Sequence, residues 1–262
     1  MKFSSSKGNI EYSKVGSGPH LCFLHGFCEH SGLWADLVSR LRSDYSCLLI
    51  DLPGFGSSHE ASFDSIGDMA NLCLELLADQ GWEDCQLFGH SMGGYLALEM
   101  MSKQAFRFNS LGLIHSTAYA DSEEKKKSRL KVIRFVESQG AETFLKQFYP
   151  ALVAADNLNS LNAQLWELVR GSKQQGILSA TKAMMERQDH SELLAQIKTP
   201  VLFISGDQDQ HFPKEDILKQ AAVCNQAQLS IIQDVGHLSI LEAPQKLYEV
   251  FVEFLEFKNN TA

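Results

Sequence analysis

The chain has few positive charges and no long apolar stretch. Its 262 residues include 32 Asp and Glu against 23 Lys and Arg, so the formal net charge is −9. Binding to nucleic acid calls for a basic face, so this balance argues against nucleic acid as a main partner. No window approaches the length of a membrane span, and residues 1–7 lack the apolar stretch of a signal peptide. We therefore expect a soluble, cytoplasmic protein that does not associate with membranes.

The sequence also lacks the patterns that bind metals and nucleotides. Its six cysteines form no Cys-X-X-Cys pair, and no histidine stands beside one at metal-ligand spacing. No glycine-rich loop carries the lysine of a P-loop, and the dinucleotide glycine spacing after the first strand is missing. We expect neither a metal nor a cofactor. Four cysteines lie inside apolar runs, which predicts buried thiols in a reducing compartment: Cys22, Cys47, Cys73 and Cys85.

What is present is an alternation of short apolar runs with helical periodicities. With 44% apolar residues, the chain suits one large domain or one domain with an insertion. Residues 9–15 predict a strand of an N-terminal hairpin. Continuously apolar strands are expected at 20–25, 45–51, from 85, and at 110–116, 201–204 and 229–233. Helices are expected at 31–42, 66–79, after the serine motif to about 104, and at 214–223 and 244–257. This pattern predicts an α/β fold with a mostly parallel sheet covered by helices on both faces.

The alternation stops for about 70 residues in the middle of the chain. From Thr117 to about Asp189 no strand stands out, and four helical periodicities follow one another. We interpret this stretch as an all-helical insertion. The predicted division is therefore residues 1–117 for the first part of the core, 118–189 for a helical cap, and 190–262 for the second part of the core.

The most specific motif is Gly89-His90-Ser91-Met92-Gly93, which lies between an apolar run and a predicted helix. This pattern is typical of a nucleophile elbow, a strained turn that points the serine hydroxyl out of the fold. Glycine has no Cβ, so strand and helix can approach closely there. The helix N-terminus favours negative charge beside Ser91. A strand-to-helix turn with an incidental serine is the alternative, so the interpretation depends on partners elsewhere in the chain.

A serine nucleophile needs a base and a carboxylate that orients the base. In an open α/β sheet these groups lie on loops at the carboxyl ends of the strands. Asp207 and Asp209 follow the strand that ends at Ile204, and His237 follows the strand that ends near Gln233. The chain order of serine, acid and histidine is the one found in enzymes with a nucleophile elbow.

Together these segments resemble the α/β-hydrolase fold superfamily over essentially the whole chain. The matching segments are His25-Gly26-Phe27, the loop 51–58, the elbow, Gly206-Asp207-Gln208-Asp209 and Gly236-His237-Leu238. The resemblance implies the α/β-hydrolase fold with a helical cap inserted after the sixth strand. This branch includes small esterases, enol-lactonases and carbon–carbon bond hydrolases.

The resemblance also implies roles for individual residues. Ser91 is the expected nucleophile and His237 the expected base. In the family the carboxylate usually sits three residues after the strand-end glycine, which favours Asp209; Asp207 is the alternative, with a turn role as its other interpretation. The acid accepts the Nδ1–H of the histidine and stabilises the imidazolium.

Two backbone N–H groups are expected to form the oxyanion hole, those of Met92 and Phe27. His25 is expected to hold the oxyanion loop by hydrogen bonding and not to act as a second base. His115 lies at the end of the sixth strand. It could touch the substrate or the cap there, but we favour a structural role. The loop 51–58 is expected to form turns and to carry no chemistry.

The predicted function is hydrolysis of a small ester, thioester or lactone through an acyl-enzyme on Ser91. The partner is then a small-molecule acyl substrate, and the chain is a monomer or a homodimer. Carbon–carbon bond hydrolysis or a lyase reaction on the same triad, and a non-catalytic small-molecule binder, are the alternatives. Basic residues at 125–131 either attract an anionic substrate or, as we favour, form a solvated helix face beside Glu123 and Glu124. Some of the large apolar residues of the cap are expected to line the pocket, among Phe135, Phe144, Phe148, Trp166, Met184 and Met185.

Overall fold

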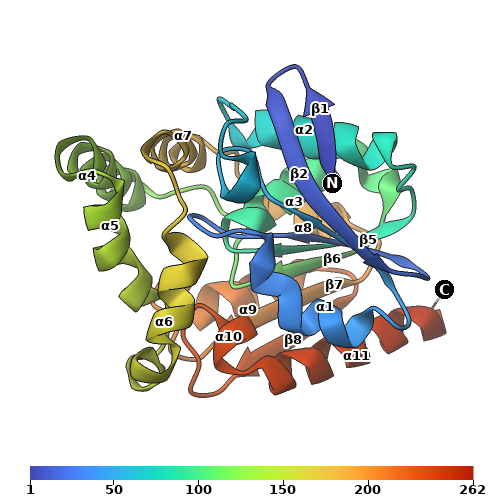
Figure 1. The fold of residues 1–262 in the computed structure, drawn as a ribbon. Coiled ribbons are helices and arrows are strands. Elements are labelled where there is room, and N and C mark those ends of the chain that lie inside the picture. Colours follow the sequence, from blue (N-terminus) through green and yellow to red (C-terminus); the bar gives the residue numbers. More distant parts are fainter. Residues whose placement is uncertain (262) are drawn as a thin grey trace.

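A twisted eight-stranded sheet runs through the centre of the molecule (Figure 1). The computed structural model describes residues 1–261. The strand order across the sheet is β1-β2-β4-β3-β5-β6-β7-β8; only the pairs β1–β2 and β2–β4 are antiparallel. The predicted N-terminal hairpin and mostly parallel sheet are therefore confirmed. The strands are β1 (Lys2–Ser5), β2 (Gly8–Gly16), β3 (His20–Leu24), β4 (Ser46–Ile50), β5 (Cys85–His90), β6 (Phe108–Ile114), β7 (Val201–Gly206) and β8 (Ala227–Ile232).

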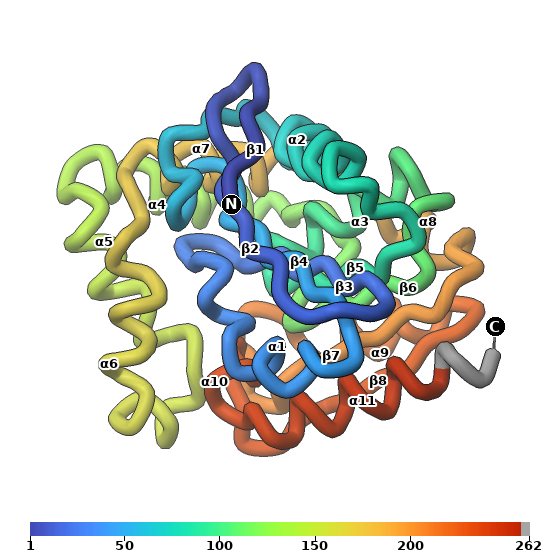
Figure 2. Tube along the Cα trace, turned by 45° about the vertical axis from the view of Figure 1, so that its right-hand side comes forward, coloured from blue at the N-terminus to red at the C-terminus, as the bar shows by residue number. Residues whose placement is uncertain are grey.

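Helices cover both faces of the sheet, which explains why its central strands are apolar throughout. α1 (Ala35–Leu41) and α11 (Pro244–Thr261) lie on one face, and α2 (Ile66–Asp79) and α3 (Met92–Gln104) on the other (Figures 1 and 2). α9 (Lys214–Val223) connects β7 to β8. Within residues 1–261, no helix has both the length and the apolar character needed to cross a bilayer. No disulfide joins the six cysteines, and all but Cys224 are buried.

Several details differ from the sequence-based expectations, among them the short helix α8 (Ser191–Gln196), which was not predicted. The helix expected over 31–42 is divided into a 3₁₀ turn at Ser31–Trp34 and α1. The side chain of His30 accepts the Gly32 N–H at 3.1 Å and shapes this first turn. The four-residue helix α10 (Ser239–Glu242) was not predicted, because so short a segment shows no helical periodicity.

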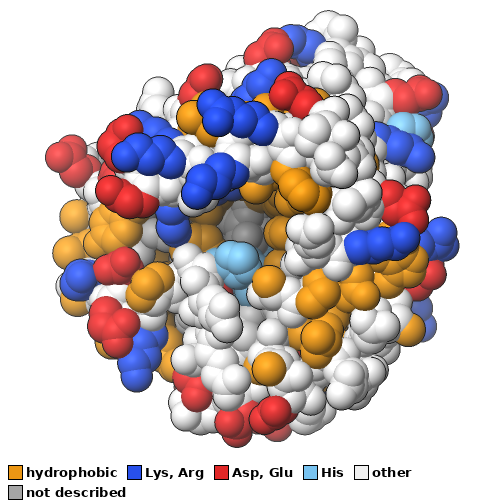
Figure 3. All heavy atoms as spheres, turned by 90° about the vertical axis from the view of Figure 1, so that its left-hand side faces the viewer, with side chains coloured by type: hydrophobic (Ala, Val, Ile, Leu, Met, Phe, Trp, Pro, Cys, Tyr) orange, Lys and Arg blue, Asp and Glu red, His pale blue; other side chains and the backbone are white. Residues whose placement is uncertain are grey.

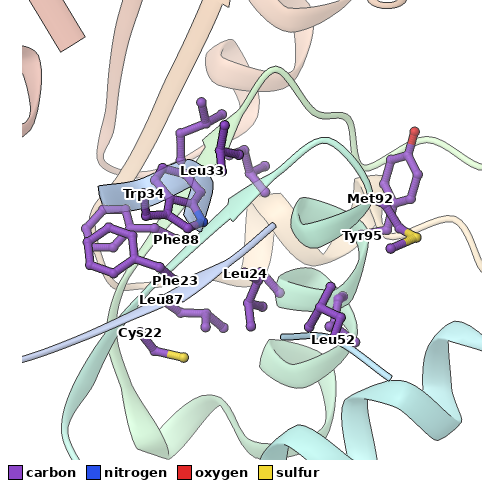
Figure 4. Close-up of a cluster of buried hydrophobic side chains, with 14 of the residues drawn as sticks. Cys22, Phe23, Leu24, Leu33, Trp34, Leu52, Leu87, Phe88, Met92 and Tyr95 are labelled. Atoms are coloured by element: carbon purple, nitrogen blue, oxygen red, sulfur yellow. The ribbon is translucent and has the colours of Figure 1, made fainter. Parts of the chain in front are cut away.

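Aromatic side chains fill the core between the sheet and the helices α1 and α11. Phe23 and Phe88, on neighbouring strands, stack at 5.4 Å between ring centroids, and Phe251 of α11 lies 4.8 Å from Phe88. The ring centroid of Trp34 lies 5.1 Å from that of Phe23. Figure 4 shows the two side chains next to each other. Each of these side chains is fully buried and contributes about 1.5–3 kcal/mol by burial. The core therefore fixes β3 and β5, the strands that lead into the oxyanion loop and the elbow.

The stretch between β6 and β7 is helical, as predicted, and it follows the sixth strand. It contains α4 (Glu123–Gln139), α5 (Ala141–Phe148), α6 (Leu158–Val169) and α7 (Gln174–Met185), and the short α8 (Ser191–Gln196) leads back to the sheet. The Ser122 hydroxyl accepts the Lys125 N–H at 3.3 Å and begins α4. β5, β6 and β7 are parallel, so their carboxyl ends share one edge of the sheet, and α4 to α7 lie beside this edge (Figure 1).

Candidate active site

The turn between β5 and α3 holds Ser91 in a strained backbone conformation. Its φ of 50° and ψ of −114° are rare for a residue with a side chain. The hydrogen bond from the Ser91 N–H to the Ile114 carbonyl, at 2.9 Å, helps to hold this conformation. A Cβ at Gly89 would lie 2.2 Å from the Gly93 oxygen, and one at Gly93 would lie 2.4 Å from the Leu24 oxygen. The glycines therefore allow the close approach that the elbow pattern predicts.

Asp209 and His237 meet at the ends of β7 and β8, although 28 positions separate them in the sequence. The His237 Nδ1–H donates to Asp209 Oδ2 at 2.9 Å. Asp209 Oδ1 accepts the backbone N–H groups of His211 and Phe212 at 2.8 and 3.4 Å. Asp207 has no such contact, and its Oδ1 accepts the Val235 N–H at 3.3 Å, within the loop. Of the two aspartates, only Asp209 can orient His237.

A second histidine, His115, also contacts the Asp209 carboxylate. The Ser239 N–H donates to His115 Nε2 at 3.3 Å, so the proton of the neutral ring lies on Nδ1. This Nδ1–H then donates to Asp209 Oδ2 at 3.0 Å. His115 is fully buried and has a φ of 47°. It therefore has the structural role favoured from the sequence, but its contact with Asp209 was not predicted.

The environment keeps Asp209 charged and His237 neutral. Burial alone would raise the pKa of Asp209, but attraction to His237 and hydrogen bonds from both histidines outweigh it and hold the pKa well below its usual range. Burial lowers the pKa of His237, and the nearby Asp209 charge offsets only part of that effect. Near neutral pH, the Nε2 atom of His237 is therefore able to accept a proton.

Ser91 and His237 line one cavity of about 360 Å³ between the sheet edge and the helices α4, α5 and α7. Figure 3 looks into this hollow, with a histidine at its lower edge and Lys and Arg side chains along one side of its rim. Among residues 1–261, the Ser91 hydroxyl has no hydrogen bond to the His237 ring. Such bonds are often long in ligand-free sites and tighten when substrate binds. Three of the six apolar cap residues considered above line the cavity: Phe144, Phe148 and Met184.

The two expected oxyanion donors are positioned by backbone geometry. Met92 is the first residue of α3, where a helix leaves its N–H groups without intrahelical partners. The Phe27 N–H has no hydrogen-bond partner within the described part of the chain, and its ring lines the cavity. His25 Nε2 accepts the Leu52 N–H at 2.9 Å, so its Nδ1–H donates to the Gly26 carbonyl at 2.8 Å. His25 thus holds the loop before Phe27.

A buried ion pair beside the cavity was not apparent from the sequence. Glu29 Oε2 accepts the Gly26 N–H at 2.6 Å and lies 3.0 Å from His90 Nδ1. His90 Nε2–H donates to the His237 carbonyl at 2.9 Å. Because both partners of His90 are acceptors, the ring carries a proton on each nitrogen and pairs with the Glu29 carboxylate. Burial opposes this charge, but attraction between the two groups raises the pKa of His90 and lowers that of Glu29. The pair links the oxyanion loop to the loop of His237.

The carboxylate and imidazole groups of His115, Asp209 and His237 lie within 4.8 Å of one another, a grouping that could also hold a metal ion. However, the Nδ1 proton of His115 occupies the atom that faces Asp209. A metal ion would have to displace this proton and the hydrogen bonds that His115 and His237 donate to Asp209. The donor set therefore fits hydrogen bonding better than metal ligation.

The model of the alpha/beta hydrolase fold family matches residues 19–244. The chain belongs to this family. Its fold class and the resemblance noted from the sequence are thereby confirmed. At the sheet edge, Ser91 and His237 line the cavity, and Asp209 contacts His237 from behind the lining.

Curated relatives of the chain span nearly its full length. It is 26% identical to a pimeloyl-[acyl-carrier protein] methyl ester esterase of Nitrosomonas europaea, over 93% of this chain and 98% of that protein. It is 28% identical to 3-oxoadipate enol-lactonase 1 of Acinetobacter baylyi, over 95% and 92%. Among solved structures, a thermophilic esterase from Thermogutta terrifontis superposes with a TM-score of 0.92 at 25% identity, covering 98% of both chains.

Proposed function

We propose that this alpha/beta hydrolase is a serine hydrolase that cleaves small carboxylic esters, thioesters or lactones. The observation that carries the proposal is the Asp209–His237 hydrogen bond, at the rim of a cavity that also contains the strained Ser91. The family match and the esterase and enol-lactonase relatives support the same class of reaction.

In the proposed mechanism, the Ser91 Oγ attacks the carbonyl carbon of the substrate while His237 Nε2 takes the hydroxyl proton. Asp209 accepts the Nδ1–H of the resulting imidazolium and stabilises its charge. The N–H groups of Phe27 and Met92 donate to the oxyanion, and losing one such donor typically costs about 3 kcal/mol of barrier.

Collapse of the tetrahedral intermediate then breaks the bond to the leaving group. His237 returns its proton to the departing oxygen or sulfur, and the acyl group stays on Ser91. Water, deprotonated by His237, attacks the acyl-enzyme in the same way and releases the carboxylic acid. The buried Asp209 keeps its negative charge throughout.

We also propose that residues 118–189 form a cap and residues 1–117 and 190–262 the core. Side chains of α4, α5 and α7 form one side of the cavity: Lys125, Ser128, Arg129, Val132, Phe144, Phe148, Thr181 and Met184. A cap that forms the cavity wall in this way selects the substrate, whereas the core supplies the reacting groups.

Turnover of p-nitrophenyl acetate and butyrate by wild type and Ser91→Ala tests the proposal. We expect wild type to release p-nitrophenol and the variant to lose at least about 10³-fold in kcat, since nucleophile and base act as one unit. Equal turnover by the two proteins, or none by wild type on any ester of the series, would refute the assignment and favour a binding protein.

A further inference from the structure

Two basic residues one turn apart on α4 line the cavity that contains Ser91 and His237. They are Lys125 and Arg129. Their neighbour Lys126 does not line the cavity; its Nζ pairs with Glu123 at 2.9 Å on the solvent side. The basic stretch of α4 is therefore divided: part of it is a solvated face, as expected, and part faces the proposed active site.

The positive charges near the cavity exceed the negative ones. Arg129 and Arg187 share one carboxylate, that of the buried Asp121, and Arg187 Nη1 donates to it at 2.6 Å. Lys125 Nζ donates to the His211 carbonyl at 3.2 Å and lies 4.8 Å from the centre of the Phe212 ring. Within residues 1–261, no carboxylate lies within 4 Å of Lys125 Nζ.

Two other carboxylates lie nearby. Glu29, the single carboxylate among the described lining residues, is buried and paired with His90. Asp209 lies behind the lining, on His237, and attracts Lys125 from there, so an excess of one positive charge remains beside the cavity in a protein whose net charge is −9. The excess of positive charge is local, and an anion in the cavity would be attracted to it.

The rest of the wall is largely apolar. Val132, Phe144 and Phe148 lie on the cap side, and Phe212 lies between Lys125 and His237, with its ring centroid 5.5 Å from that of His237. A ligand that fits this wall has an apolar middle, a reactive carbonyl at Ser91 and an anionic end at Lys125.

We propose that Lys125 selects esters or lactones whose acyl part carries a free carboxylate, such as the half-esters of dicarboxylic acids. This inference rests on the proposed hydrolase function and adds the substrate class. The Lys125 ammonium donates to the substrate carboxylate, and Arg129 adds to the attraction. A neutral ester of the same length lacks this contact and binds only through the apolar wall.

The test compares monomethyl adipate with dimethyl adipate, measuring methanol release by wild type, Lys125→Met and Lys126→Met. Methionine keeps the apolar stem of the lysine and removes its charge. We expect wild type to prefer the monoester, and Lys125→Met to lose about tenfold in kcat/KM for the monoester only, as a charged hydrogen bond is lost. Lys126→Met, the matched control, should behave like wild type, and added salt should weaken the preference.

The outcomes separate the two proposals. Equal effects of Lys125→Met on both esters, or no effect on either, would overturn the inference and leave the hydrolase function standing. A wild-type preference for the diester would also overturn the inference without affecting the hydrolase function. If wild type cleaves neither adipate ester and no p-nitrophenyl ester, both the inference and the proposed function fail. Matching melting temperatures of the three proteins show that the comparison is between folded proteins.

Discussion

Replacing Glu29 by glutamine should destabilise the protein, because one oxygen of Glu29 serves two donors. Oε2 accepts the Gly26 N–H at 2.6 Å and pairs with His90 Nδ1 at 3.0 Å. An amide oxygen at that position keeps the bond to Gly26 but removes the charge that stabilises a protonated His90. An amide nitrogen there can donate to neutral His90 but then faces the Gly26 N–H. Glutamine therefore satisfies only one of the two groups.

The size of the effect follows from burial. Glu29 is 2% exposed and His90 is fully buried, so water cannot replace the lost partner. An unsatisfied buried donor or acceptor costs about 1–3 kcal/mol. A loss of about 2 kcal/mol lowers the melting temperature of a chain this long by about 4–8 °C. Glu29→Ala, which leaves the His90 charge without a partner, should cost more, about 3–5 kcal/mol.

The assay is thermal unfolding of wild type, Glu29→Gln and a control, Glu142→Gln. Glu142 pairs with Lys146 at 2.7 Å, but their side chains are 71% and 60% exposed, so no measurable shift is expected. If Glu29→Gln has the same melting temperature as wild type and the control, the buried ion pair does not stabilise the fold.

The pH dependence gives a second check on the same pair. The raised pKa of His90 means that its contribution is complete below the ordinary value of 6.5 and is lost as the pH rises through the pKa of the folded state. The lowered pKa of Glu29 means that its contribution is present above 4.5 and is lost as the pH falls through the folded-state pKa. The gap between wild type and Glu29→Gln should thus be largest between about pH 4.5 and 6.5 and smaller at pH 9.

Three further predictions concern the base, the second histidine and the elbow. Because burial lowers the pKa of His237, kcat/KM should rise with pH through a pKa below the ordinary 6.5 and then level off; a midpoint above 6.5 contradicts this. His115→Phe removes one of four hydrogen-bond donors to Asp209. The free energy of unfolding, measured with denaturant, should fall by about 1.5–3 kcal/mol, and kcat/KM should fall as well. Unchanged values would show that His115 does not support the carboxylate. Gly89→Ala places a Cβ 2.2 Å from the Gly93 oxygen and should lower the melting temperature sharply. Gly171→Ala is the control, because a Cβ there has no heavy atom within 4 Å and should leave the melting temperature unchanged. Similar melting temperatures for the two variants would refute the close approach at Gly89.

Much of the fold could be predicted because each strand and helix leaves a local pattern. The continuously apolar runs indicated parallel strands, and the loss of that pattern after Thr117 indicated the helical insertion. The carboxyl ends of neighbouring parallel strands share an edge, so topology alone brings the loops of Asp209 and His237 together. The elbow glycines mark the turn at Ser91 for a similar reason, since only glycine tolerates the contacts found there.

The contacts around this frame could not be predicted, because they join side chains that no local pattern relates. Glu29 and His90 are 61 positions apart, and His115 and Asp209 are 94 apart. Their pairing depends on how the rings are oriented and on small differences in the distances between atoms. The presence of His115 at a strand end was the one available signal, and it did not distinguish a substrate contact from support of the carboxylate.

The cap residues that line the cavity could not be predicted either. Phe144 and Met184 line the cavity, but Phe135 and Trp166 do not, although all four are large apolar residues on predicted helices. Periodicity indicates which side of a helix is apolar. It does not indicate whether that side packs on another cap helix or faces the substrate, since both surroundings favour apolar residues.

In the proposed mechanism, Ser91 is the nucleophile and His237 activates it. The most direct measurement is peptide mapping by mass spectrometry after labelling with a fluorophosphonate, in wild type and in His237→Ala. We expect a single adduct on Ser91 in wild type and greatly slowed labelling in the variant. An adduct on Ser128, the other serine that lines the cavity, or labelling of Ser91 at the same rate without His237, would contradict it.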